Sequence, residues 1–149
     1  MRSYANKGAV DFVKNVDITG SLRVTNGSSI TGSLTVSGSA VITGSVQGNV
    51  NSLTIASNTA SLDLNNGNFF TLQLVSGSAT NINPSNIKPG QTVNIKISTT
   101  GSGTVTFPSS VLQASGSSYV PTTTTGTDII TLISFDSSNL YLANVKNLI

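Results

Sequence analysis

The chain has 149 residues, enough for one domain or for a small domain with an appendage. Only 8% of its residues are charged and its net charge is +2, so no clustered basic surface for nucleic acid is expected. It has no His, Cys, Trp or Glu, and 60 of its residues are Ser, Thr or Asn, so the composition favours an all-β protein without disulfides or soft-metal sites.

Residues 1–15 show neither the periodicity of a helix nor that of a strand. A small apolar cluster lies beside lysines, and no apolar run follows Met1, so no ordinary export signal is expected. We interpret this segment as an anchor that binds another protein, although it could instead pack back on its own chain. The candidate anchor residues are Tyr4, Lys7, Phe12 and Lys14.

Residues 16–50 contain a repeat. Ile-Thr-Gly-Ser occurs at 18–21, 30–33 and 42–45, so the spacing is twelve residues both times. Because this spacing is even, equivalent residues of successive repeats keep the same parity. Every even position from 16 to 50 is apolar, glycine or small and polar. Successive side chains of a strand point to opposite faces, so the pattern predicts one continuous apolar face.

Twelve residues per turn are too few for a single chain to wrap around an Ile/Leu/Val interior, which needs roughly 18 residues per turn. We therefore expect several chains to share each turn, as an intertwined trimeric β-stalk. The alternative is a pair of ordinary hairpins with turns at Asn26-Gly27 and Ser37-Gly38. The expected trimer interface consists of Ile18, Leu22, Val24, Ile30, Leu34, Val36, Ile42 and Val46.

The apolar parity changes near Val50, because Leu53 and Ile55 occupy odd positions. Such a phase change indicates a boundary between about 50 and 60. We accordingly assign residues 16–55 to the stalk and residues 56–149 to a C-terminal domain.

The C-terminal domain is expected to contain about seven or eight short strands, arranged as a β-sandwich or jelly-roll-like head. Asn65 to Asn68 predicts a hairpin turn, and Ile129 to Phe135, apolar on both parities, predicts a central strand. The Ser/Thr tracts 98–104 and 122–125 and the segment around Pro84 are expected to be loops. The other expected strands lie at 61–64, 70–74, 93–97, 105–107 and 140–145.

Several stretches resemble a family of known proteins. The runs 67–74, 81–91, 103–111, 121–132 and 135–141 are similar to a small β-domain that recurs in virion proteins of tailed bacteriophages. The Gly-Ser-Leu-x-Val-x-Gly-Ser repeat resembles the shafts of phage fibre and appendage proteins. The resemblance covers about residues 17–145 and implies a trimeric fibre, spike or capsid decoration protein. Many such domains carry a Trp near the position of Leu112 or Gln113, and this chain has none.

The sequence thus predicts a non-enzymatic structural protein without metal or cofactor, because its only carboxylates are five aspartates that do not pair across a cleft. The expected partners are further copies of the chain and a capsid, portal, neck or tail protein, within a virion assembled in the host cytoplasm. No nucleic acid binding and no membrane insertion are expected.

Two alternatives stay open. The head could be a module that recognises a host-surface glycan or protein through Tyr119, Tyr141 and the 122–125 loop. The chain could also be a bacterial extracellular filament subunit or an ice-binding solenoid, although Thr19, Thr31 and Thr43 form a single rank.

Overall fold

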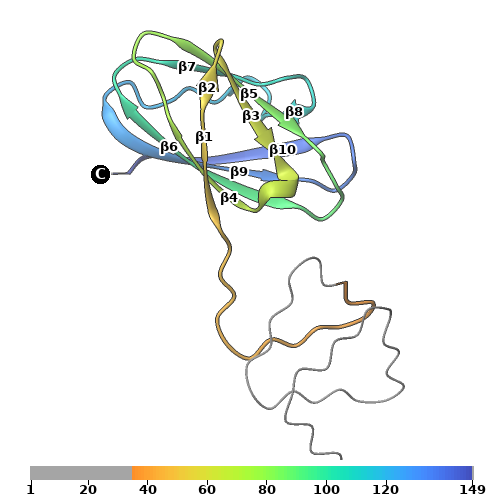
Figure 1. Cartoon of the computed structure of the whole chain (residues 1–149). Coiled ribbons are helices and arrows are strands. Elements are labelled where there is room, and N and C mark those ends of the chain that lie inside the picture. The colour runs from red at the N-terminus through yellow and green to blue at the C-terminus, as the bar shows by residue number, and fades with distance from the viewer. Residues whose placement is uncertain (1–34, 149) are drawn as a thin grey trace, which may run out of the picture. The chain divides into compact units, whose positions relative to one another are not determined.

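A computed structural model describes residues 35–148 of the chain, and residues 44–148 belong to one compact unit. The described part is all-β, with a single 3₁₀ turn, η1 (Leu64–Asn66), and no α-helix (Figure 1). No helix in the described part is long and apolar enough to cross a membrane. The strands are β1 (Val50–Leu53), β2 (Ile55–Ala56), β3 (Thr59–Asp63), β4 (Phe69–Gln73), β5 (Ala79–Ser85), β6 (Thr92–Thr100), β7 (Thr104–Thr106), β8 (Val111–Leu112), β9 (Thr125–Ile133) and β10 (Leu140–Leu148).

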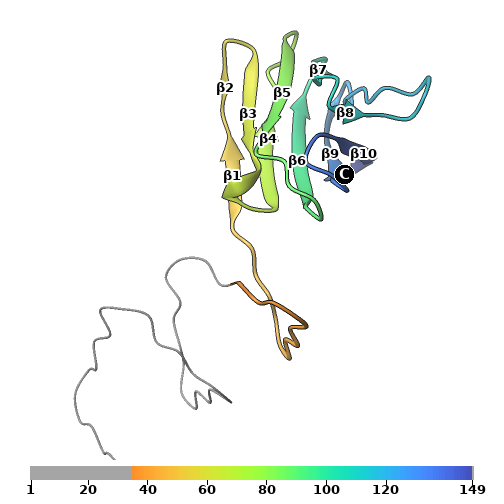
Figure 2. The same ribbon diagram turned by 90° about the vertical axis from the view of Figure 1, so that its right-hand side faces the viewer.

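The first seven strands form a solenoid-like coil of about three turns, because the chain passes back and forth between two sheets. Sheet A has the order β1-β4-β6-β9-β10-β8, and sheet B has the order β2-β3-β5-β7. The pairs β1–β4, β4–β6, β3–β5 and β5–β7 are all parallel. Figure 2 shows these strands stacked side by side from β1 and β2 towards β6 and β7.

One hydrophobic core lies between the two sheets. Strand β6 alternates strictly, so that Val93, Ile95 and Ile97 are buried while Asn94 and Lys96 face outward, as the alternation in the sequence predicts. Register then stacks apolar side chains from strand to strand, with Ile95 between Phe70 of β4 and Ile130 of β9. Burying each such side chain stabilises the fold by about 1.5–3 kcal/mol.

The C-terminal strands close sheet A with antiparallel pairing. Strand β9 pairs with β6 over nine residues and with β10 on its other side, so the prediction of a central strand here is confirmed. The strand covers 125–133 rather than 129–135, because its first residues are threonine, glycine and aspartate and carry no apolar signal.

Three predictions of local structure are wrong. Asn65 to Asn68 does not close a hairpin, because β3 belongs to sheet B and β4 to sheet A, so the chain crosses between sheets here. Pro84 lies within the parallel strand β5 rather than in a loop. The expected loop at 98–104 is mostly strand, because the Thr99 side chain is buried and its hydroxyl donates to the Thr124 carbonyl.

The coil also differs from the expected topology. A jelly-roll-like head is built from antiparallel hairpins. Among themselves, by contrast, the strands β1 to β7 pair in parallel, apart from the short β2–β3 pair. About half of the predicted stalk, residues 16–34, lies outside the described residues. Of the remainder, residues 35–49 contain no strand, whereas β1 and β2 belong to sheets A and B.

Candidate interaction surface

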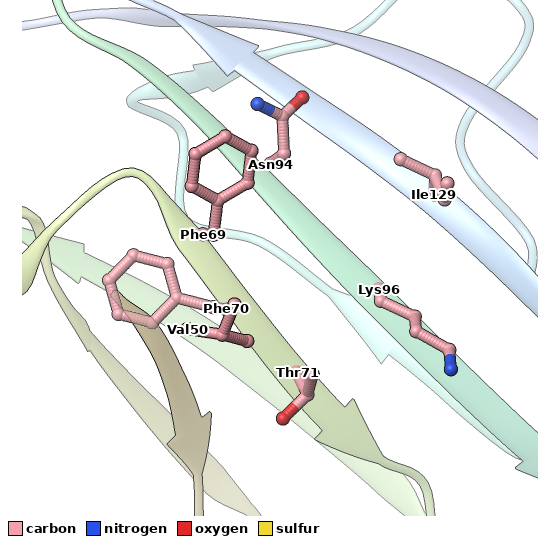
Figure 3. A pocket seen from close by; sticks show the side chains of 7 residues that line it. All are labelled: Val50, Phe69, Phe70, Thr71, Asn94, Lys96 and Ile129. Carbon is pink, nitrogen blue, oxygen red and sulfur yellow. The ribbon is translucent and has the colours of Figure 1, made fainter. Parts of the chain in front are cut away.

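The side chains that face away from the core on β1, β4, β6 and β9 form a hollow of about 440 Å³, which we call the outer-face hollow. Figure 3 shows that its side chains come from four neighbouring strands. Three of its apolar side chains are open to solvent, since Val50 is 66% exposed, Phe69 43% and Ile129 37%. Its lining is Val50, Phe69, Phe70, Thr71, Asn94, Lys96 and Ile129.

Strand register fixes this hollow. Val50 pairs with Phe69, and Lys96 of β6 pairs with Ile129 of β9, so apolar and polar side chains are both brought together on the outer face. The chain before β1 also approaches it closely, because a Cβ added to Gly48 would lie 3.0 Å from a ring carbon of Phe69. Lys96 is the one charged residue in the lining.

A second apolar cluster lies at the end of sheet A. The rings of Phe135 and Tyr141 meet edge to face with centroids 5.6 Å apart, and Phe135 is 74% exposed. Tyr141 is half-exposed and pairs with Leu112 of β8, which is also exposed. The predicted contact residue Tyr141 therefore lies on the surface, and its role in binding a ligand stays a prediction.

The other predicted contact tyrosine is buried. Tyr119 is only 4% exposed, packs its ring 6.4 Å from that of Phe107, and donates its hydroxyl hydrogen to Asp128 at 2.8 Å. Burial, followed by the neighbouring Asp128 carboxylate, raises the pKa of Tyr119. The structure thus places Tyr119 in the core and not on the surface, and its role in binding a ligand stays a prediction. The Ser/Thr-rich sequence around it resembles an exposed loop, but its ring completes the core.

Asp128 is the centre of a buried polar network. It is fully buried on β9 and accepts four hydrogen bonds: from the Tyr119 hydroxyl (2.8 Å), the Thr122 amide (2.8 Å), the Thr122 hydroxyl (2.6 Å) and the Asn147 amide (2.8 Å). Burial acts to raise the pKa of Asp128, but these hydrogen bonds outweigh it and the pKa is lowered. The carboxylate thereby ties the 119–122 loop and β10 to β9.

The predicted 122–125 contact loop is divided between core and surface. Thr122 is buried against Asp128, Thr125 begins β9, and Thr123 and Thr124 are exposed. The exposed part lines a hollow of about 460 Å³ made by Val120, Pro121, Thr122, Thr123, Thr124, Lys146 and Asn147.

The other carboxylates of the described part hold turns. Asp63 accepts from the Asn86 side chain and the Asn65 amide, and these bonds lower its pKa. Asp136 accepts from the Ser138 and Asn139 amides, which lowers its pKa as well. Among residues 35–148 no three His, Cys, Asp or Glu side chains gather as metal ligands would.

The remaining predicted site residues divide into two sets. Within the described part, Val36, Ile42 and Val46 of the expected trimer interface are exposed. The predictions that lie outside the described residues concern the interface residues Ile18, Leu22, Val24, Ile30 and Leu34, and the anchor residues Tyr4, Lys7, Phe12 and Lys14.

No family model matches this chain, and neither a curated protein nor a solved structure is detectably similar to it. Function is therefore inferred from the repeat, the outer-face hollow and the exposed aromatic pair. Of these, the described end of the repeat, residues 35–50, and the hollow both have large apolar side chains that the described residues leave exposed.

Proposed function

We propose that this protein is a non-enzymatic structural protein of a tailed-bacteriophage virion, a homotrimeric fibre, spike or capsid decoration protein. Residues 16–49 form its intertwined stalk, and the two facing sheets, which begin with β1 at Val50, form a sandwich-like head. The observation that carries this proposal is that Val36, Ile42, Val46 and Val50, at even positions of the repeat, are left exposed, as is the whole described end of the repeat from 35 to 50. Several large apolar side chains exposed within one short segment are typical of a surface that another chain covers.

The proposed mechanism is mechanical. Even-position side chains of three chains meet around a common axis, where burial stabilises the assembly by roughly 25 cal/mol per Å² of apolar area. Shared turns also pair the strand edges that would otherwise promote aggregation. Residues 1–15 attach the trimer to a capsid, portal, neck or tail protein, and the protein is located in the virion.

Sedimentation equilibrium of the full chain tests this function. We expect the mass of three 15.2 kDa chains. The double variant Ile30→Asn/Leu34→Asn places polar side chains on the even face and should give a lower mass. The matched control Thr31→Asn/Thr35→Asn changes the odd face and should keep the trimer. A monomeric full chain would rule out the shared stalk.

A second candidate function is host-surface recognition by the head, which the exposed Phe135–Tyr141 pair favours. Exposed aromatic rings supply rigid contact area for glycans and proteins. The Tyr141→Ala variant should then lose binding to host cells while keeping its oligomeric mass. Unchanged cell binding in this variant, or no binding by the unaltered protein, would remove this candidate.

A further inference from the structure

The even-position strip of the repeat continues onto the outer face of sheet A. Val50 is the last even-position apolar residue of the strip and the first residue of β1. Its side chain is exposed and lines the outer-face hollow, whereas Leu53, at an odd position, packs against the core. The change of parity in the sequence is thus the point at which the strip passes to the outside of the sheet.

The outer face of sheet A has exposed apolar side chains beyond β1 as well, on either side of the polar outer face of β6. Phe69 on β4 and Ile129 on β9 are exposed, and Val145 of β10 lies beside Ile129 in the register and is exposed too. The inner face of the same strands already packs into the core. Sheet A therefore has apolar side chains on both faces, and only the inner face is covered by described residues.

We propose that the outer face of sheet A, defined by Val50, Phe69, Thr71, Ile129 and Val145, is an interface with a second copy of this chain. The proposal rests on the proposed trimeric function and extends the copy-to-copy contact from the stalk into the head. It follows from continuity: a copy that covers the even positions up to Val46 next meets Val50, which is already part of the hollow.

The charge of this face fits a second copy. Lys96 is the one charged residue in the hollow, and no aspartate lines it, so the face carries a single positive charge. A lysine can cover apolar surface with its methylene chain while its ammonium reaches water. A face with one cation is therefore compatible with packing against a largely uncharged surface of a neighbouring copy.

The absence of cysteine from the chain makes the test specific, since a single introduced thiol is unique. We would prepare full-length Ile129→Cys and Val145→Cys, which place a thiol on the outer face of sheet A. The matched control is Ser61→Cys, because Ser61 is exposed on β3 of sheet B. Each is also combined with Ile30→Asn/Leu34→Asn, and thiol labelling rates are measured beside the oligomeric mass.

In the oligomer, the thiols at 129 and 145 should react on the order of tenfold more slowly than in the dissociated double variant, because interface packing excludes water. The thiol at 61 should react equally fast in both. An oligomer in which all three thiols react at unchanged rates would overturn this interface and leave the trimeric stalk standing. A monomeric full chain would overturn both proposals, and slow labelling in a monomer would mean that another segment of the same chain covers the face.

Discussion

The coil (residues 50–106) and the C-terminal cap (residues 111–148) are held together by different interactions. In the coil, parallel strands stack apolar side chains in register, and several of its polar side-chain contacts, such as Asn86 with Asp63, lie at exposed turns. In the cap, antiparallel strands are locked by one buried carboxylate, Asp128. Apolar stacking can be repeated turn after turn, whereas the carboxylate network fits a single arrangement of its loop and strands.

The largest effect is expected from a cavity in the coil. Ile82 is fully buried on β5, between β3 and β7. Ile82→Ala should lower the free energy of unfolding by about 4 kcal/mol, since it removes buried methyl groups from a packed core. Urea unfolding followed by circular dichroism would measure this.

The conservative variant Ile82→Val removes a single methyl group and should lower the free energy of unfolding by about 1 kcal/mol. If Ile82→Ala unfolded the coil while the cap transition stayed in place, the two regions would be separate cooperative units. A single shifted transition would show that they unfold together.

The next effect is expected in the cap. Asp128→Asn keeps the shape of the side chain but replaces one acceptor oxygen with a donor, which then faces two of the four hydrogen-bond donors. We expect the free energy of unfolding to fall by about 2–3 kcal/mol, because buried donors are left without acceptors. The same urea titration measures it, and Asp136→Asn, at an exposed turn, is the matched control. Equal shifts of the urea midpoint for the two variants would mean that burial of the network contributes nothing to the free energy of unfolding.

The smallest effect on the stability of the fold is expected from a change of pH close to neutrality. The pKa of Asp128 is lower in the folded protein than the value of about 3.9 in an unfolded chain. Its contribution to stability is therefore complete above that value and is lost as the pH falls through the folded pKa. Urea midpoints should be flat from pH 7 to about 5 and fall below it. Asp128→Asn should fall less steeply, with the remaining slope due to Asp63 and Asp136. An identical slope in this variant would contradict the assignment.

The sequence predicts the strands of the coil better than their pairing. Alternation marks Val93, Ile95 and Ile97 as inward-facing, but parallel and antiparallel strands share the same alternation. The crossing from sheet to sheet depends on backbone bends such as that at Asn86, which follows β5 of sheet B and has a φ of +59°. A sequence of asparagines and glycines does not distinguish such a bend from a hairpin.

The candidate surfaces were predictable only in part. Asp128 shares the inward parity of Ile130 and Leu132, which could have identified it as buried. Its partners Tyr119, Thr122 and Asn147 come from distant positions, so the network required the folded chain. The outer-face hollow was missed because Phe69 lies just before the expected strand 70–74 and Ile129 was assigned to a buried central strand.

The antiparallel closure of sheet A sets an order of events during synthesis. Strand β6 ends at Thr100, and β9, which covers its edge over nine residues, is complete only at Ile133. At about 5–20 residues per second, a ribosome needs roughly 2–7 seconds to make the 33 residues between these points. During that interval the nascent coil presents an unpaired nine-residue edge, so a chain that stops early keeps this edge, and only a chain translated through β9 covers it.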